Sequence, residues 1–245
     1  MEIKEYVKGV KGLIFDYGGT IDTGGVHWSH IIWEAWQQAG VGCTLPLFRE
    51  AYVYGERELA RTRHILPGHD FNDLLRIKVE IELQWLAEQG EFAPADIKPY
   101  AQKIAGICNG KAVASIEAAR PVLEALSSRF PMVMVSNFYG NLKTVLKTYG
   151  ISEYFKKVVE SAVEGVRKPD PAIFEKGVEA LGLQAADVLA IGDSYRKDIE
   201  PALKAGCRAV WLKGTGWEAA EEENTYEYTI KNLQELVKLL ASPVN

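Results

Sequence analysis

Three short apolar runs that each end on a polar side chain, with helical patterns between them, constrain the fold of this chain more than any other feature. The runs end at Asp16, Ser136 and Asp193. From Ser115 onward, strand-like runs alternate with helical patterns of about ten to fifteen residues, which predicts crossover connections and a parallel sheet. Ligands on such sheets bind at the carboxyl ends of the strands, so we expect the three polar side chains to lie together.

The segment 11–22 is predicted to be a strand that delivers a carboxylate into a tight turn. Its apolar residues end at Phe15, and Asp16 follows at once, before Gly18 and Gly19. Because glycine has no Cβ, the backbone can curl closely around a small charged group there. A strand-ending Asp also commonly caps the next turn, so this segment alone leaves a structural role open.

The stretch between the first strand and residue 114 is predicted to be helical throughout. From Val26 to Gly40, apolar residues recur at spacings of three and four, which indicates one face of a helix. Further helical patterns run over 46–63, 70–89 and 94–114, each bounded by Gly or Pro. We therefore expect an α/β core formed by residues 1–23 and 114–245, with residues 24–113 inserted as an all-helical cap.

The core is expected to continue with strands at 157–160, 207–212 and 228–230, with helices near 116–128, 140–149, 196–205 and 233–240, and with a helix that opens at Asp170 and Pro171. A strand that ends at Gly192 completes the pattern. The fold class that follows is α/β, with a parallel sheet and helices between its strands.

Composition excludes several functional classes. A net charge of −5 provides no basic face for nucleic acid or an anionic membrane. No apolar run approaches the roughly 20 residues of a membrane span, and the first residues lack the order of a signal peptide. We therefore expect a cytoplasmic location and neither nucleic-acid nor membrane partners, while the oligomeric state stays open. The three cysteines contain no CxxC pair, which favours buried thiols over a disulfide framework or a zinc site.

Two further motifs complete an ordered set. Lys168 precedes a Pro-Asp-Pro helix start, and Asp198 lies five residues after Asp193. Taken together, the four motifs between residue 11 and about residue 235 resemble those of the haloacid dehalogenase superfamily, most of whose members are phosphohydrolases with an aspartate nucleophile. The resemblance implies a Rossmann-like sheet and a helical cap after the first motif, which closes over the site and selects small substrates.

A magnesium site is expected at the strand ends. Asp16 and Asp193 would repel each other unless a cation lay between them, and oxygen ligands without soft donors suit Mg²⁺. By resemblance, the backbone carbonyl of Gly18 would be the third protein ligand. Asp198, by its place in the last motif, would orient the lysine or a metal-bound water.

The resemblance also implies how phosphate would be handled. Asp16 would attack phosphorus and form an aspartyl phosphate, with Lys168 as the second catalytic side chain. Phosphate oxygens would be held by Thr20, Ser136, Asn137 and Lys168. Thr20 could instead cap the turn, and Asn137 could instead fix the loop.

Gly18 is the main departure from the family pattern. Phosphatases of this superfamily usually carry a second Asp at this position, which protonates the leaving group and then activates water. Such acid and base catalysis is typically worth about a hundred- to ten-thousand-fold in rate. The chain has lost rate, uses a substitute, or acts on acyl or aryl phosphates that need no acid. Candidate substitutes are Asp22, Tyr17, His27 and His30.

The sequence favours a magnesium-dependent phosphohydrolase of a small phosphorylated metabolite. One alternative is a catalytically weakened relative that binds a phosphorylated ligand or a protein partner, which Gly18 supports. Another is a metal-independent 2-haloacid dehalogenase, towards which Tyr17 points. A phosphonate-cleaving activity is disfavoured because no lysine lies between Lys11 and Lys78. The basic residues of the cap suit either a second anionic group of the substrate or a solvated helix face: Arg49, Arg57, Arg61, Arg63, His64 and His69.

Overall fold

Six parallel strands form one sheet with the order β3–β2–β1–β4–β5–β6. The computed structural model describes residues 2–217 and 224–241. The strands are β1 (Gly12–Phe15), β2 (Met132–Ser136), β3 (Lys157–Glu160), β4 (Val188–Gly192), β5 (Arg208–Leu212) and β6 (Thr229–Ile230). β1 lies in the middle of the sheet, with β2 on one side and β4 on the other. The predicted α/β class and the parallel sheet are confirmed, and the three polar strand ends lie at the same edge.

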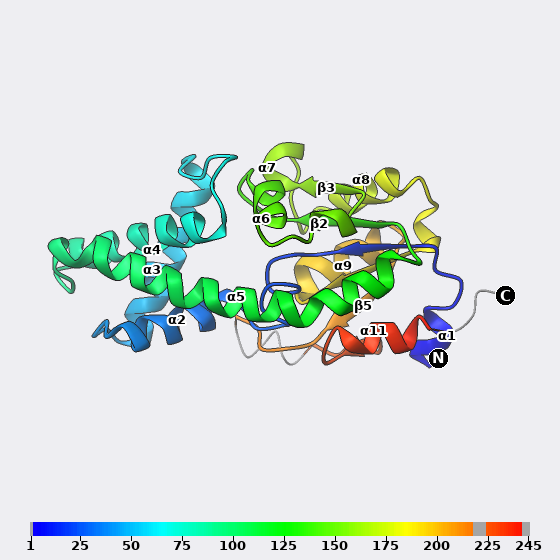
Figure 1. Cartoon of the computed structure of the whole chain (residues 1–245), viewed down its shortest axis with the longest axis horizontal. Coiled ribbons are helices and arrows are strands. Elements are labelled where there is room, and N and C mark those ends of the chain that lie inside the picture. The colour runs from blue at the N-terminus through cyan, green and yellow to red at the C-terminus, as the bar shows by residue number, and fades with distance from the viewer. Residues whose placement is uncertain (1, 218–223, 242–245) are drawn as a thin grey trace.

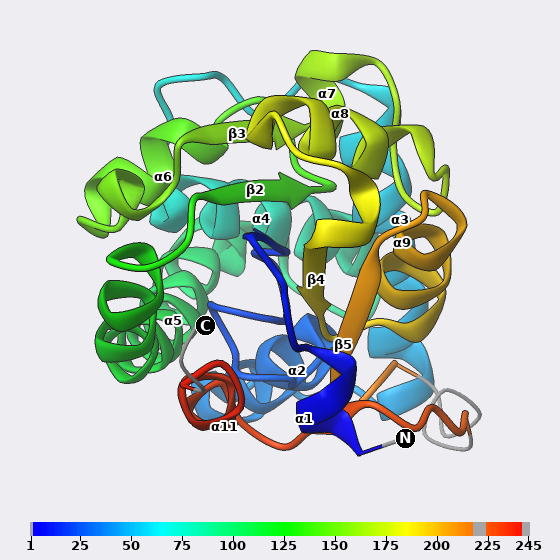
Figure 2. The ribbon, with the colours of Figure 1, turned by 90° about the vertical axis from the view of Figure 1, so that its right-hand side faces the viewer.

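Both faces of the sheet are covered by helices, because the strands are apolar on both sides (Figure 2). In β1, Leu13 and Phe15 point into one apolar core and Ile14 into the other, as side-chain alternation along a strand requires. The first core includes residues of α5 (Ile97–Ser127) and α11 (Gln234–Leu239), and the second includes residues of α8 (Ala172–Leu181) and α9 (Glu200–Lys204). Burial on both faces is typical of parallel sheets.

A group of helices stands at one end of the core, beyond the carboxyl ends of the strands (Figure 1). It consists of α2 (Trp28–Ala39), α3 (Leu45–Arg61), α4 (Phe71–Glu88), the 3₁₀ turn η1 (Pro94–Asp96) and the first half of α5. Thr44 caps α3, and Asp70 and Asp73 form a capping box at the start of α4. These side chains accept hydrogen bonds from N–H groups that have no partner inside the helix.

A single helix of 31 residues, α5, connects the cap to the core (Figure 1). The sequence predicted two helices here, and the predicted break at residue 115 is wrong. Residues 110–115 contain only one glycine and no turn-forming pair. Because α5 packs along α2, α4 and α11, tertiary contacts extend the helix across this weak stretch. The boundary expected between residues 113 and 114 therefore falls inside a helix.

Short elements complete the chain. They are α1 (Ile3–Tyr6), α6 (Leu142–Thr148), η2 (Ser152–Tyr154), α7 (Ser161–Glu164), η3 (Ala185–Asp187) and η4 (Tyr195–Ile199). The helix predicted over 196–205 begins with the π-helical turn η4 and continues as α9. Single π turns are frequent at functional sites. Among the helices of the described residues, none has both the length and the apolar composition needed to cross a membrane.

Candidate active site

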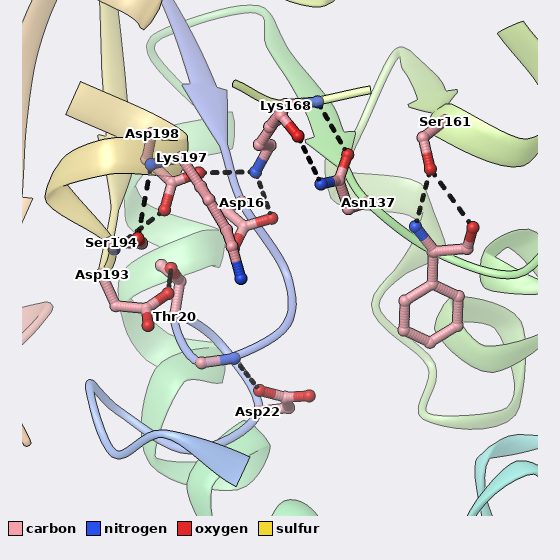
Figure 3. A network of polar contacts seen from close by, with 12 residues as sticks. Asp16, Thr20, Asp22, Asn137, Ser161, Lys168, Asp193, Ser194, Lys197 and Asp198 are labelled. Atoms are coloured by element: carbon pink, nitrogen blue, oxygen red, sulfur yellow. Dashed lines mark hydrogen bonds and ion pairs between the residues drawn. The ribbon is translucent and has the colours of Figure 1, made fainter. Parts of the chain in front are cut away.

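Three acidic side chains converge at the carboxyl edge of the sheet (Figure 3). Asp16 follows β1, Asp193 follows β4, and Asp198 lies on η4. One carboxylate oxygen from each residue lies within 4.8 Å of the other two. Asp16 is 7% exposed and Asp198 2% exposed. The separate sequence motifs are therefore adjacent in space, as their positions at strand ends predicted.

Lys168 lies between two of these carboxylates. Its Nζ donates to Oδ1 of Asp16 and to Oδ1 of Asp198, each over 2.6 Å. Burial alone would lower the pKa of Lys168, but the two adjacent carboxylates outweigh that effect and raise the pKa above its usual value. The other oxygen of Asp198 accepts from the Ser194 N–H over 2.9 Å. Asp198 thus fixes the lysine, and the lysine stays charged beside Asp16.

The Asp193 carboxylate packs directly against the backbone of Gly19, which only a residue without a Cβ permits. Thr20 Oγ1 donates to Asp193 Oδ1 over 2.8 Å, and a Cβ on Gly19 would lie only 2.3 Å from Asp193 Oδ2. Burial, and then the carboxylates of Asp198 and Asp16, raises the pKa of Asp193 well above its usual value. A divalent cation between the carboxylates would remove this electrostatic conflict, so this set of oxygen donors fits Mg²⁺.

The end of β2 supplies two polar side chains, Ser136 and Asn137, which have different surroundings. Ser136 ends β2, is 1% exposed and lines the cleft above the sheet. The Asn137 amide instead braces the neighbouring loop: its Nδ2 donates to the Lys168 carbonyl over 3.0 Å, and its Oδ1 accepts from the Lys168 N–H over 2.9 Å. Both the oxygen and the nitrogen of the Asn137 amide are used in these hydrogen bonds. This geometry fits the role of fixing the loop, the second of the two roles expected for Asn137.

A cleft of about 1330 Å³ lies between these residues and the cap. Asp16, Gly18 and Asp193 line it from the core, and side chains of α3 and α4 line it from the cap. A Cβ placed on Gly18 would have no atom within 4 Å. The position of the family's second Asp is therefore open space at the edge of the cleft.

Two of the four candidate replacements for that acid lie outside the cleft lining, Tyr17 and His30. Tyr17 is fully buried, and its ring packs edge-on against two phenylalanines. Its hydroxyl has no hydrogen-bond partner among the described residues. His30 donates from Nε2 to the carbonyl of Gly216 over 2.8 Å. Neither side chain can reach a substrate in this arrangement.

The other two candidates, Asp22 and His27, line the cleft but are engaged elsewhere. Burial, followed by Lys197 and Lys78, lowers the pKa of His27 to about 3, so the ring is neutral near pH 7. Its Nδ1 accepts from the Ser29 N–H at the start of α2.

Asp22 is held by two hydrogen bonds within its own segment. Burial raises the pKa of Asp22 to about 8, so the carboxyl group retains a proton near neutral pH. Its oxygens accept from the Gly19 N–H over 2.7 Å and from the Trp28 Nε1–H over 2.9 Å. Asp22 therefore braces the turn that carries Gly18 and Gly19, and none of the four candidates stands at the position of the missing acid.

The basic residues of the cap differ in the partners that they have among the described residues. Arg61 and His64 both pair with Glu58. Arg49 lies over the Trp217 ring, 5.5 Å from its centre. His69 accepts at Nδ1 from a backbone N–H in its own loop. The exposed Arg57 and Arg63 line the cleft.

Several charged residues of the cleft were not predicted from the sequence, among them Glu56, Lys78 and Lys197. Lys78 lies on the buried stripe of α4, between Leu75 and Val79. A charge inside an apolar stripe was the signal that could have identified it. Lys197 directly precedes Asp198 in the last motif, and only the π-helical turn shows that it faces the cleft.

Comparison with known proteins identifies the family. A family model described as haloacid dehalogenase-like hydrolase matches residues 10–206, which is most of the chain. The chain belongs to this family of hydrolases. The predicted resemblance is confirmed, and the protein is an enzyme of the haloacid dehalogenase-like hydrolase class.

Two relatives of this hydrolase have named substrates. It is 34% identical over 91 residues to glyceraldehyde 3-phosphate phosphatase of Methanocaldococcus jannaschii, a match of 37% of this chain and 40% of that protein. It is 28% identical over 213 residues to phosphoglycolate phosphatase of Pectobacterium atrosepticum, 83% of this chain and 80% of that protein. The first match thus spans less than half of the relative's length.

Solved structures share the fold of the hydrolase over nearly its whole length. A dehalogenase with an intermediate complex has a TM-score of 0.66 and 18% identity, covering 96% of this chain and 99% of that chain. The HAD-hydrolase YfnB of Bacillus subtilis, bound to magnesium, has a TM-score of 0.57 and 20% identity. The match covers 94% of this chain and 98% of that chain. At such identities the likeness shows the fold alone.

Proposed function

We propose that this hydrolase releases phosphate from a small phosphorylated metabolite, with Asp16 as the nucleophile. An oxygen of Asp16 forms a bond to phosphorus, and the bond from phosphorus to the leaving group breaks, so that the leaving group departs with the electron pair. Water then attacks phosphorus, which releases phosphate and restores the carboxylate. Relatives named as phosphatases support this reaction class.

The contact of Lys168 with both Asp16 and Asp198 carries this proposal. A charged lysine at 2.6 Å from Oδ1 holds the Asp16 carboxylate in place, and it remains beside the phosphate to stabilise developing negative charge. Asn137 sets the position of this lysine through its backbone. Ser136 would donate a hydrogen bond to a phosphate oxygen. The Thr20 hydroxyl, for which phosphate binding was the first expectation, instead donates to Asp193 and would orient that carboxylate.

Magnesium fits the same site. Asp16, Asp193 and the carbonyl of Gly18 would hold the ion. Asp198 would not be a ligand and would orient Lys168. Bound there, the ion would neutralise phosphate oxygens and balance the crowded carboxylates. A structural relative described as bound to magnesium supports this assignment.

Gly18 would restrict the leaving group. Without an acid at that position, the leaving oxygen must depart unprotonated, which favours acyl and aryl phosphates over alkyl phosphates. The proposed division into a core, residues 1–23 and 114–245, and a cap, residues 24–113, would place substrate selection in the cap. We propose a small phosphorylated substrate and a cytoplasmic location for this hydrolase.

The test is phosphate release from an acyl, an aryl and several alkyl phosphates, with and without Mg²⁺, by the wild type and Asp16→Asn. Asp96→Asn, an exposed change of the same kind on the cap, is the matched control. We expect release that needs both Mg²⁺ and Asp16 and that is fastest with the activated substrates. Release by Asp16→Asn at the wild-type rate would exclude the assigned nucleophile.

The same variants test the two alternatives. Metal-independent halide release from a 2-haloacid would show a dehalogenase. Phosphate-analogue binding without turnover of any substrate would show a weakened, binding relative. The buried position of Tyr17, outside the cleft lining, removes the sequence feature that pointed towards dehalogenation.

A further inference from the structure

A second group of charged side chains lies in the cleft and has no role in the chemistry proposed above. We call it the roof cluster, and it consists of His27, Glu56, Lys78 and Lys197. All four line the cleft that contains Asp16. After burial, the charges with most influence on the pKa of His27 are Lys197 and Lys78. Against the effect of burial, Lys78 and Lys197 also lower the pKa of Glu56. The four side chains therefore lie within electrostatic reach of one another.

The part of the roof cluster that belongs to the cap is a fixed ion pair. Lys78 on α4 pairs with Glu56 on α3, and the Lys78 side chain is only 5% exposed. Its Nζ also lies 4.1 Å from the centre of the Tyr52 ring. From the core, Tyr139 donates a hydrogen bond to Glu56 over 3.4 Å. The pair has no net charge, so it can bind polar groups but cannot by itself select an anion.

Lys197 differs from that pair because its ammonium group is unpaired. The ammonium group makes no hydrogen bond or ion pair with any residue in 2–217 or 224–241, whereas the backbone N–H of Lys197 donates to Ser194 Oγ. In Figure 3 its side chain extends from η4 into the space in front of Asp16. Arg57 and Arg63 also line the cleft, but the two charges with most influence on the pKa of His27 and of Glu56 are Lys78 and Lys197. Lys197 is therefore the member of the roof cluster whose ammonium group has no partner among the described residues.

The carboxylates at the strand ends and the Glu56–Lys78 pair are balanced without Lys197, while the exposed arginines at 57, 63, 167 and 196 also line the cleft. Lys168 and the proposed Mg²⁺ balance the carboxylates of Asp16, Asp193 and Asp198 at the strand ends. Lys78 balances Glu56, and His27 is neutral. Lys197 thus adds one positive charge between the carboxylates at the strand ends, where phosphate would bind, and the Glu56–Lys78 pair of the cap, where the leaving group would lie. An ammonium group at this point attracts an anion on the leaving group and forms a charge-assisted hydrogen bond with it.

We infer that Lys197 binds a second anionic group, carried by the leaving group, and that the substrate is therefore a phosphorylated acid. The inference rests on the proposed phosphohydrolase function and makes Lys197 a specificity-determining residue. The Glu56–Lys78 pair would bind polar groups beside that anion. A carboxylate and a second phosphate share the chemistry that Lys197 recognises.

Binding measured without turnover separates this inference from the proposed reaction. Calorimetry on the Asp16→Asn protein with Mg²⁺ gives the dissociation constants of two probes, phosphoglycolate and ethyl phosphate. The first probe carries a carboxylate where the second carries a methyl group. The same pair is measured after adding Lys197→Met, Lys197→Arg or Lys204→Met. Lys204 is an exposed lysine of α9 outside the cleft and is the matched control.

We expect phosphoglycolate to bind more tightly than ethyl phosphate, and Lys197→Met to reduce that ratio by roughly ten- to a hundredfold. Lys197→Arg should retain most of the preference, and Lys204→Met all of it. Propane-1,3-diol bisphosphate measured against propyl phosphate tells whether a second phosphate is preferred to a carboxylate. Equal weakening of both probes by Lys197→Met would mean that Lys197 contacts the transferred phosphate, and would overturn the inference. An absence of preference in the parent protein would overturn it too, whatever the outcome of the phosphate-release assay.

Discussion

At the scale of single residues, Gly18 is the position where function can be altered most directly. A Cβ there meets nothing within 4 Å, and Gly18 is not among the glycines with positive φ, so an aspartate fits without strain. Gly18→Asp should raise kcat on alkyl phosphates by at least about tenfold, because a positioned acid is typically worth a hundredfold or more. Aryl phosphates, whose leaving groups need no proton, should gain little.

The comparison of the two substrate types is the measurement that decides this prediction. Gly68→Asp, at another open position with an ordinary backbone conformation, serves as the control and should change neither rate. An equal gain on aryl and alkyl phosphates would mean that the new carboxylate acts through charge or metal binding and not as an acid. No gain at all would show that the missing acid does not limit turnover.

Lys168 links catalysis to stability through a single side chain. It is 4% exposed and is the hydrogen-bond donor shared by Asp16 and Asp198. Lys168→Met should abolish phosphate release and cost about 3–5 kcal/mol of unfolding free energy, because two buried carboxylates lose their partner. Urea denaturation measures that loss, and Lys176→Met, which breaks a half-exposed pair with Glu164, should cost less than about 1 kcal/mol. A similar cost for both variants would contradict the central role of Lys168.

At the scale of elements, the loop after β2 holds the loop before α8 in register. The Asn137 amide supplies both hydrogen bonds, to the N–H and to the carbonyl of Lys168. Asn137→Ala should lower kcat by about ten- to a hundredfold, because Lys168 loses its alignment with Asp16. The stability cost should be about 1–3 kcal/mol for the unpaired backbone groups.

The control for this brace is Asn232→Ala, since Asn232 is exposed and its amide bonds only to Glu235 among the contacts found in the described residues. Steady-state kinetics should show a fall in kcat with little change in KM for Asn137→Ala. A change confined to KM would instead support direct contact between the amide and phosphate, which is the other role that the sequence suggested.

The elements that could be predicted from sequence are those with a strong local pattern. β1, β2 and β4 are short apolar runs with polar ends, and their order along the chain was enough to bring Asp16, Ser136 and Asp193 to one edge. The continuity of α5 was not predicted, because residues 110–115 mix good helix formers such as Ala112 and Ala114 with Gly110, and packing against other helices decides their state. The inward direction of Lys197 depends on a π-helical turn, for which the sequence has no recognised signal.

The roles of polar residues were harder to predict than their positions. Asn137, Asp22 and His27 all lie near the cleft, yet each is engaged with backbone groups of its own or a neighbouring segment. Spacing along the chain shows that such side chains come close to the site. It does not show which hydrogen-bond partners they meet there, because these depend on the conformation of the nearby backbone for Asp22 and His27 and on a segment far along the chain for Asn137.

At the scale of the whole molecule, the cap contains a carboxyl group that links overall stability to pH. Glu82 on α4 is fully buried, and neither of its carboxyl oxygens has a hydrogen-bond partner among the described residues. Gly55 on α3 makes room for it, since a Cβ there would lie 2.8 Å from Glu82 Cγ. Burial raises the pKa of Glu82 to about 8, from an ordinary value of 4.5.

Between those two pH values the folded protein keeps a proton on Glu82 that the unfolded chain releases. The folded state therefore binds more protons than the unfolded state, and the free energy of unfolding falls as the pH rises from about 4.5 to about 8. The slope from one such group approaches about 1.4 kcal/mol for each pH unit. Asp22, whose pKa is also raised to about 8, acts in the same direction.

Glu82→Gln should flatten this dependence, because the amide has nearly the same shape and no proton to lose. Urea denaturation at pH 5.5 should give similar free energies of unfolding for the variant and the wild type, whereas at pH 8.5 the variant should be the more stable by a few kcal/mol. Part of the slope should remain in the variant through Asp22. Glu153→Gln, an exposed change of the same kind on η2, should leave the wild-type curve unaltered. Parallel curves for Glu82→Gln and the wild type would show that the buried carboxyl group is not the source of the pH dependence.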